Sequence, residues 1–572
     1  MTPLKFAGWG HPGKEFTLAD KPDLCKFITR VTGLEDFEAK PLVNPDSIAI
    51  PPPRLSEAFL ADLQAVLAPE WIRTDREMRL LHCYGKSYRD LLRSFAGEAT
   101  RPPDLVVFPG CHDEVETLLR IAAKHGVKVI PFGGGTNIVG GVEASPSLAG
   151  TIATVSLRRM RRVLSIDAVS LTARIEVGIL GPELEESLNR EGFTLGHFPD
   201  SFEHSTLGGW LATRSAGMQS DRWGRIEDMV LSLTLVTPRG TLRTPSVPKA
   251  ATGPDLNQIA VGSEGVLGIL TEATMRLHRL MGREHRGLLL PDFASGVALL
   301  RDCAQLGIPV STMRLSCPEE THLGVAMKPR RKGTKALVQQ IGKEWLRYTR
   351  NFHFETACAL IVGFEGSPRE IAMRRKEFSR IVKSCGGIDL GTSSGEHWYA
   401  GRYDYPYLRD ALMVRGGMVD VVETSVVWSE VESLCRAMKE TLHAHFLRSG
   451  HEGYVGCHLS HTYQAGACLY FTFASLREEG RATEQYFETK SLAIELLIRH
   501  GAALSHHHAV GYEHRPWIRR ALGETAMALL RGLKEAVDPE DLCNPGKLLP
   551  PKEGDDDLFP LSFPDHDLSS FS

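Results

Sequence analysis

The sequence has few of the features that mark metal-binding, secreted or membrane-spanning proteins. It contains 11 cysteines in 572 residues, yet no two stand at the C-x-x-C spacing, so neither a zinc site nor a disulfide framework is indicated. No apolar run approaches the roughly 18 residues that cross a bilayer, and the residues after Met1 lack the apolar core of a signal peptide. We therefore expect a soluble or peripheral protein in a reducing compartment.

An excess of positive charge is also missing. Lys and Arg number 66 against 70 Asp and Glu, and the formal net charge of -4 gives no reason to expect a nucleic-acid partner. With 42% hydrophobic and 24% charged residues, the composition is that of an ordinary globular chain with room for two or three domains. Any anionic ligand must therefore be held by local groups.

Proline- and glycine-rich breaks, together with hydrophobic periodicity, divide the chain into five segments. Residues 1–100 have a mostly helical pattern, as in 56–67, and carry no obvious chemistry. A boundary at Arg101-Pro102-Pro103 opens an α+β domain over 101–280, in which 231–236 and the residues after the turn at 238–240 form two strands. Strand-like and helix-like runs alternate over 281–505, which indicates a second, α/β domain, followed by a C-terminal segment at 506–550. The acidic, serine-rich residues 551–572 are predicted to be a solvated tail.

A glycine-rich loop follows the first clear helix and strand. Asp113 is a predicted helix cap with Glu116 three residues on, Gly126 ends that helix, and 127–130 form a buried strand. Three consecutive glycines then expose backbone N–H groups that can converge on a phosphate. The spacing matches neither G-x-G-x-x-G nor a P-loop. From this loop alone, an anion cradle and a structural turn are equally good interpretations.

Further small-residue segments favour the cradle, because one extended cofactor needs donors without bulky side chains along its whole length. The predicted cofactor-binding residues are Pro131, Phe132, Gly133, Gly134, Gly135, Thr136, Asn137, Asp200, Ser201, Phe202, Glu203, His204, Ser205, Thr206, Thr213, Arg214, Ser215, Ala216, Glu264, Gly265, Val266, Leu267, Gly268, Ile269 and Leu270.

Three adjacent histidines, His506, His507 and His508, can supply donors, acceptors and protons near neutral pH. A plain surface tract is the alternative. A shared metal ion is not expected, because in an extended segment His506 and His508 point one way and His507 the other.

These features together resemble a known family. The chain is similar to the alkyldihydroxyacetonephosphate synthases, within the flavoproteins of the vanillyl-alcohol-oxidase type, over nearly its whole length to about Pro550. Besides the two glycine-rich segments, the matches include Phe6-Ala7-Gly8-Trp9-Gly10, Thr237-Pro238-Arg239-Gly240, Thr252-Gly253-Pro254-Asp255 and Ser505-His506-His507-His508. The resemblance implies an α+β fold with a two-part FAD-binding domain over 101–280, an α/β substrate (cap) domain over 281–505 and a helical N-terminal region. FAD is expected to be bound without a covalent link.

The resemblance also implies roles for single residues. Tyr463 matches the family's active-site tyrosine, Arg409 a phosphate-binding arginine, and Arg314 another substrate-binding arginine; the three histidines join Tyr463 as catalytic residues. From sequence alone, a buried structural tyrosine and a helix-surface ion pair are the ordinary interpretations of Tyr463 and Arg409.

The implied reaction exchanges the acyl group of acyl-dihydroxyacetone phosphate for a long-chain fatty alcohol, giving alkyl-dihydroxyacetone phosphate and a fatty acid without net oxidation. The alternative is an FAD-dependent oxidase or dehydrogenase of a 2-hydroxy acid. We expect a homodimer at a membrane surface, cytoplasmic or peripheral on the inner face, since no peroxisomal targeting extension precedes the Gly8-Trp9-Gly10 match. Residues 509–517 depart from the family pattern, which bears on substrate range. The basic stretch 328–335 is either a solvated loop or a contact with anionic lipid.

Overall fold

The computed structural model describes residues 4–328 and 352–550; the tail predicted at 551–572 lies outside them. Short helices make up the N-terminal part, and Ser56 caps the helix expected within 56–67 through the Phe59 amide. Its elements are α1 (Pro22–Thr32), η1 (Pro45–Ser47), α2 (Glu57–Gln64), η2 (Pro69–Trp71), α3 (Arg76–Leu81) and α4 (Tyr88–Ala96).

The glycine loop emerges from a four-stranded sheet of order β1-β2-β4-β3, in which β2, β4 and β3 run parallel. Its strands are β1 (Ile72–Arg73), β2 (Leu105–Val107), β3 (Lys128–Phe132) and β4 (Ile152–Ser156), with α5 (His112–His125) between β2 and β3. The predicted cap at Asp113 is wrong: the helix begins at His112 after Cys111, and Asp113 lies in the first turn, where a negative charge still suits the helix dipole.

The second sheet of this part is antiparallel, with the order β5-β6-β10-β8-β9. The hairpin predicted around 231–240 is confirmed by the pairing of β8 with β9. The strands are β5 (Val163–Asp167), β6 (Thr172–Glu176), β8 (Val230–Thr237), β9 (Gly240–Arg243) and β10 (Ile269–Arg276), and β7 (Phe193–Thr194) pairs separately with β11 (His278–Arg279). The helices here are α6 (Gly181–Arg190), α7 (Leu207–Thr213), α8 (Ser220–Trp223), α9 (Ile226–Met229) and α10 (Leu256–Ala260).

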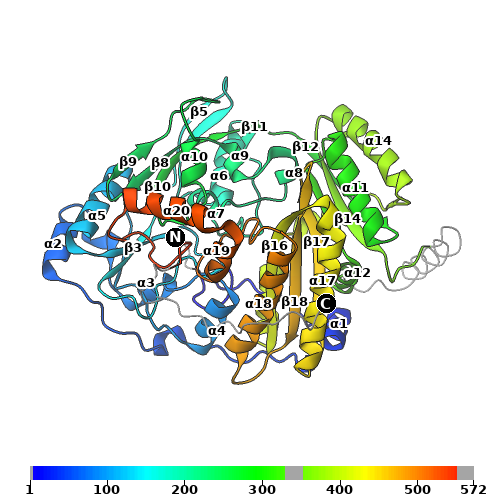
Figure 1. The fold of residues 1–572 in the computed structure, drawn as a ribbon, viewed down its shortest axis with the longest axis horizontal. Coiled ribbons are helices and arrows are strands. Elements are labelled where there is room, and N and C mark those ends of the chain that lie inside the picture. Colours follow the sequence, from blue (N-terminus) through cyan, green and yellow to red (C-terminus); the bar gives the residue numbers. More distant parts are fainter. Residues whose placement is uncertain (1–3, 329–351, 551–572) are drawn as a thin grey trace.

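A seven-stranded antiparallel sheet dominates the rest of the chain, in the order β15-β12-β14-β13-β17-β18-β16. Its strands are β12 (Gly282–Leu290), β13 (Thr312–Ser316), β14 (Cys358–Gly366), β15 (Ile388–Asp389), β16 (Gly417–Val427), β17 (Gly453–Thr462) and β18 (Gly466–Leu476). One face is covered by α11 (Phe293–Leu306), α14 (Pro368–Ser384), α17 (Val431–Arg448) and α18 (Ala482–Arg499), as can be followed in Figure 1. The remaining elements are α12 (Pro318–Ala326), α15 (Thr392–Gly401), α16 (Tyr405–Met413) and η3 (Trp428–Glu430).

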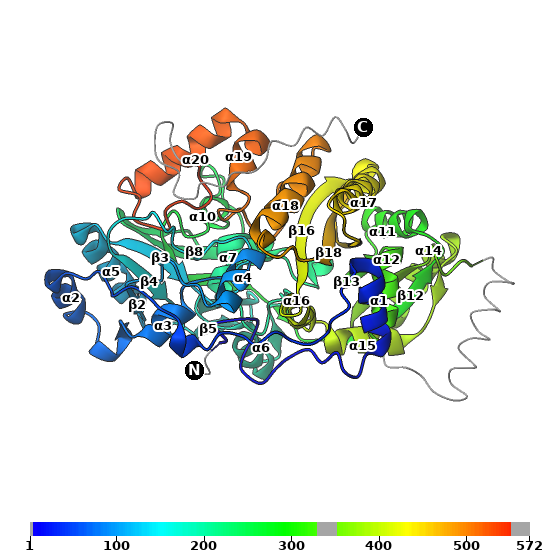
Figure 2. The ribbon, with the colours of Figure 1, turned by 90° about the horizontal axis from the view of Figure 1, so that it is seen from below.

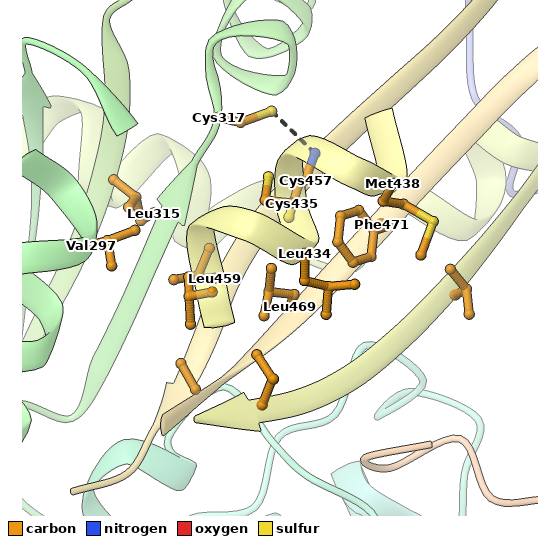
Figure 3. Close-up of a cluster of buried hydrophobic side chains, with 14 of the residues drawn as sticks. Val297, Leu315, Cys317, Leu434, Cys435, Met438, Cys457, Leu459, Leu469 and Phe471 are labelled. Atoms are coloured by element: carbon orange, nitrogen blue, oxygen red, sulfur yellow. Dashed lines mark hydrogen bonds between the residues drawn. The ribbon is translucent and has the colours of Figure 1, made fainter. Parts of the chain in front are cut away.

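Side chains along the central strands alternate between a face that packs in the core and an open face. Leu469, Phe471 and the thiol of Cys457 lie in the hydrophobic cluster beneath α17, which Figure 3 shows. Because side chains of a strand alternate between faces, Tyr470 and His458 point to the opposite side of the sheet. That open face looks toward the glycine loop.

The C-terminal segment returns to the first sheet. Helices α19 (Arg515–Leu522) and α20 (Glu524–Val537) lie across the glycine-loop domain in Figure 1, and Cys543 then bridges Val129 of β3. Figure 2 shows a second long-range contact, in which α1 lies beside the seven-stranded sheet and α12. Within the described residues, no helix is both long and apolar enough to cross a bilayer.

Candidate active site

A cavity of about 390 Å³ lies between the glycine loop and the open face of the seven-stranded sheet. This volume is in the range of small-molecule sites. The loop after β3 forms one wall, and strands β16, β17 and β18 form the other. The cavity thus brings together the two parts of the chain that carry the predicted cofactor and substrate residues.

The glycine loop is open to the cavity along its length, since all seven residues from Pro131 to Asn137 line it. A Cβ on Gly134 would stand 1.8 Å from the His204 carbonyl oxygen, so here the two segments pack backbone against backbone. Within residues 4–328 and 352–550, the amides of Gly134, Gly135 and Thr136 donate to no acceptor of the chain. Three consecutive free amides at a cavity wall are suited to a phosphate group.

The other predicted cofactor segments reach the cavity only in part. The residues that line it are Asp200, Ser201, Ser205, Thr206, Thr213, Ser215, Ala216, Glu264, Gly265, Gly268 and Leu270. Phe202, Val266, Leu267 and Ile269 are instead buried in the core of this domain. Glu203 pairs with Lys14, Arg214 bonds Gln258, and the ring of His204 packs against Trp9. The hydroxyls, free amides and open glycine positions that remain fit the pyrophosphate and polar chain of FAD.

Two buried polar side chains tie the C-terminal segment to this wall. Glu264 accepts the amides of Val510 at 2.9 Å and Gly511 at 2.7 Å, and burial raises its pKa to about 7. Asn544, which sequence analysis did not single out, donates to the carbonyls of Gly141 and Glu264 and also lines the cavity. The glycine wall therefore depends on chain segments far apart in sequence.

A buried carboxylate positions the histidine triplet. Glu423 of β16 is 1% exposed and accepts hydrogen bonds from the backbone amides of His506 at 2.7 Å, His507 at 3.1 Å and His508 at 2.9 Å. Burial opposes ionisation, but the neighbouring His507 outweighs it and holds the pKa of Glu423 well below its usual range. The chain bends around this carboxylate, so the prediction that the three histidines lie in an extended segment is wrong. As a result, His507 and His508 both line the cavity.

Tyr470, a tyrosine that sequence analysis missed, lines the cavity beside the histidines. Its ring centroid lies 5.4 Å from that of His508 and 4.8 Å from that of His458, on which it stacks. Burial raises the pKa of Tyr470 well above its usual value and lowers that of His508 well below, so a protonated hydroxyl stands beside a neutral imidazole.

Tyr463, the tyrosine predicted from the resemblance, is not among the residues that line the cavity. It follows β17 in the turn to β18, and its hydroxyl lies 2.6 Å from Nε2 of His506. His506 also stands back from the cavity, with its Nδ1 3.0 Å from Nδ1 of His507. Both residues therefore lie behind His507.

The two predicted arginines line the cavity but are engaged differently. Arg314 contacts Glu320 and places Nη2 3.1 Å from Nδ1 of His458. Arg409 donates from Nη1 to the Lys86 carbonyl at 2.9 Å, whereas its buried Nε and Nη2 have no hydrogen-bond acceptor in the described chain. Nη2 has only a carboxylate oxygen of Asp410 nearby, at 3.6 Å. A guanidinium with unused donors is suited to a substrate phosphate.

Ligand-type side chains also gather behind the histidines: Glu423, Cys468, His506 and His507 place one ligand atom each within 4.8 Å of one another. The Glu423 carboxylate is already engaged by three backbone amides, and His506 by Tyr463. We assign these groups to hydrogen bonding.

An apolar arm extends the cavity away from the histidines. It is lined by Phe27, Ile28, Val31, Leu323, Leu408, Leu412, Val419, Tyr454 and Ala474. Three of these residues belong to α1, so the N-terminal segment, whose sequence carries no obvious chemistry, contributes to the lining of the cavity. Its pattern is that of an ordinary amphipathic helix, and only the fold shows that this apolar face reaches the cavity.

Comparisons with known proteins agree with this geometry. Residues 103–246 match a family model described as an FAD binding domain, and residues 284–548 match the C-terminal domain of FAD linked oxidases. The predicted fold class and FAD as the cofactor are thereby confirmed.

Similar proteins extend over nearly the whole chain. An alkyldihydroxyacetonephosphate synthase of Dictyostelium discoideum is 39% identical, covering 98% of this chain and 95% of its own length. A synthase of the same name from Trypanosoma brucei brucei is 38% identical, with 96% and 92% covered. A solved structure of an alkyldihydroxyacetonephosphate synthase superposes with a TM-score of 0.83 at 38% identity, covering 95% of this chain and 99% of the other.

Proposed function

Since this chain belongs to the alkyldihydroxyacetonephosphate synthase family, we propose that its cavity exchanges the acyl group of acyl-dihydroxyacetone phosphate for a fatty alcohol. The protein is an FAD-dependent enzyme of ether-lipid synthesis. The observation that carries the proposal is one cavity lined by the glycine loop, the Tyr470–His508 pair, Arg409 and an apolar arm. The proposed substrate carries a phosphate, a long chain and a reacting carbon between them, and each of these needs its own groups in the cavity.

Binding is assigned to Arg409 and to the apolar arm. The free Nε and Nη2 groups of Arg409 hold the phosphate of the substrate, because a planar fork of donors matches phosphate oxygens. Arg314 is already engaged by Glu320 and His458, so we assign it to holding His458 against the ring of Tyr470. The apolar arm takes the acyl or alkyl chain.

Proton handling at the reacting carbon is assigned to Tyr470, His507 and His508. A neutral His508 accepts a proton, the protonated Tyr470 hydroxyl donates one, and Glu423 fixes the backbone that carries both histidines. FAD, when bound at the glycine wall, supplies an isoalloxazine ring that can take an electron pair from a substrate carbon and return it. Tyr463 has no direct contact with the cavity and is given no role at the substrate carbon.

The test is incubation of the purified holoenzyme with acyl-dihydroxyacetone phosphate and a labelled fatty alcohol. Label in an alkyl ether product, with one fatty acid released per ether formed and no electron acceptor required, supports the exchange. Anaerobic bleaching of the flavin by a 2-hydroxy acid, without ether formation, would instead indicate an oxidase or dehydrogenase.

We further propose that the protein is a homodimer bound peripherally to the cytoplasmic face of a membrane. Support for membrane contact comes from α12, which lines the apolar arm with Leu323 and leaves Val325 51% exposed. The homodimer is supported by the family resemblance alone. Light scattering of the purified protein and flotation with vesicles test the two parts separately.

A further inference from the structure

The exchange reaction leaves one proton to be disposed of. A carbon–oxygen bond to the acyl group breaks and that group leaves as a carboxylate, because carboxylic acids ionise near pH 4. The alcohol oxygen forms the new bond to the same carbon and loses its hydrogen. No group is oxidised or reduced overall, and each turnover releases one proton, which must leave a largely apolar cavity.

A row of hydrogen-bonding groups leads away from the cavity wall. His507 lines the cavity, and its Nδ1 lies 3.0 Å from Nδ1 of His506. Nε2 of His506, on the other side of that ring, lies 2.6 Å from the hydroxyl of Tyr463. The three side chains therefore connect in series, and only the first of them touches the cavity.

The far end of this row is a half-buried tyrosine in an exposed turn. Tyr463 stands in the turn between β17 and β18, followed by the exposed residues Gln464 and Ala465. Its neighbours on both sides, Thr462 and Gln464, line a second cavity of about 370 Å³. Water in that cavity would be next to the turn that carries the Tyr463 hydroxyl.

The inner end is held rigidly. Glu423 receives the amides of all three histidines, and the ring of His461 stacks on that of His506 with centroids 5.4 Å apart. His506 is 4% exposed, and burial lowers its pKa well below the usual value, so it passes protons as a neutral ring. Burial likewise keeps the Tyr463 hydroxyl protonated by raising its pKa. The charged or titratable groups that face this row are Asp221, Arg225, Glu227, Glu423, His461 and Cys468, with His197, Tyr470 and His508 around His507.

We propose that His507, His506 and Tyr463 form a proton exit path, in which His507 faces the cavity and His506 and Tyr463 stand apart from the substrate carbon. His507 receives the alcohol proton at Nε2 and passes its Nδ1 proton to Nδ1 of His506. The Nε2 proton of His506 moves to the Tyr463 oxygen, whose own proton goes to solvent. Each hop breaks one N–H or O–H bond and forms another, so that one proton enters and one leaves.

The path rests on the proposed exchange reaction, and its test separates the two. Fatty acid and proton release are followed together by rapid mixing of the holoenzyme in weakly buffered solution with a pH indicator. For Tyr463→Phe we expect an unchanged first turnover and an unchanged KM. Proton release should be delayed, and the steady-state kcat should fall roughly 10²-fold, the lower end of proton-transfer contributions. Adding imidazole buffer should restore kcat, because a small base can carry the proton instead.

The control is Gln464→Ala, in the same turn but outside the row, which should behave as wild type. His506→Gln, checked for full flavin content, should repeat the buffer-dependent loss. A Tyr463→Phe enzyme with normal proton release, or with a loss that buffer does not restore, would refute the path. Failure of the wild type to form any ether would refute the proposed function instead.

Discussion

The hydroxyl of Tyr470 can be removed with little other change to the cavity, because the ring stays stacked on His458. We expect Tyr470→Phe to retain FAD and to lose turnover by ~10²-fold to 10⁴-fold, the usual contribution of a positioned proton donor. The measurement is ether formation per bound flavin. Tyr399→Phe is a matched control, since that ring stacks on His285 with a centroid distance of 4.6 Å and does not line the cavity. A Tyr470→Phe rate within a few-fold of wild type would remove this hydroxyl from the mechanism.

Single residues were predictable only where the sequence pattern was local. Three adjacent histidines stand out in any reading, but their backbone partner Glu423 lies more than 80 positions earlier, inside the apolar strand β16. Tyr470 was missed because Leu469 and Phe471 make the run look uniformly apolar, although a period of two places Tyr470 on the other face. Tyr463 was favoured by position in a motif, and position alone does not show which side of a hairpin faces the ligand.

At the scale of elements, the glycine loop was the most predictable part of the site, and it gives a direct test. A methyl group at Gly134 would meet the His204 carbonyl at 1.8 Å, so Gly134→Ala must displace one of the two segments that form the wall. We expect this variant to purify with little or no flavin, seen as loss of visible absorbance. Gly532→Ala in α20 is the control, because a Cβ there meets nothing within 4 Å. Full flavin occupancy in Gly134→Ala would show that the two segments of the wall can move apart without loss of the cofactor.

Helix α1 shows what local pattern could not reveal. Its apolar face looked like an ordinary amphipathic helix, while its partners α12, β17 and β18 lie about 300 to 450 residues later in the chain. Periodicity identifies a face that will be buried, but it does not identify what covers it.

The position of α1 predicts that substitutions of Ile28 change the preference of the enzyme for the chain length of the alcohol. Ile28 lines the apolar arm and is 4% exposed, so Ile28→Phe should narrow the arm, and Ile28→Ala should widen it. For long-chain relative to short-chain alcohols, kcat/KM should fall roughly 10-fold in the Phe variant, since each methylene in an apolar pocket is worth 1–3 kcal/mol. In the Ala variant, kcat/KM for long-chain relative to short-chain alcohols should rise. Equal losses for all alcohols in both variants would indicate damage to the fold instead of a lining role.

At the scale of the whole molecule, the cavity is assembled from the N-terminal helix, the four-, five- and seven-stranded sheets and the C-terminal segment. Its apolar arm runs beneath α1 and α12, and the exposed Val325 marks the outer side of α12. Under the proposed membrane contact, the end of the molecule that carries these helices is the one expected to meet lipid.

The basic stretch 328–335 directly follows α12, and apart from Lys328 it lies outside the described residues. Basic groups near anionic lipid are worth on the order of 1 kcal/mol each, so changing Arg330, Arg331 and Lys332 to Gln should weaken vesicle binding roughly 10²-fold at low salt. Turnover of detergent-dispersed substrate should stay normal, while KM for vesicle-borne substrate rises. The matched control removes three exposed charges from α14, as Lys376→Gln, Arg380→Gln and Lys383→Gln. Sedimentation with anionic vesicles decides between the interpretations. Loss of vesicle binding in the first variant alone places the lipid contact beside α12. Equal loss of binding in both variants points to net charge. Unchanged binding in both variants leaves the stretch a solvated loop.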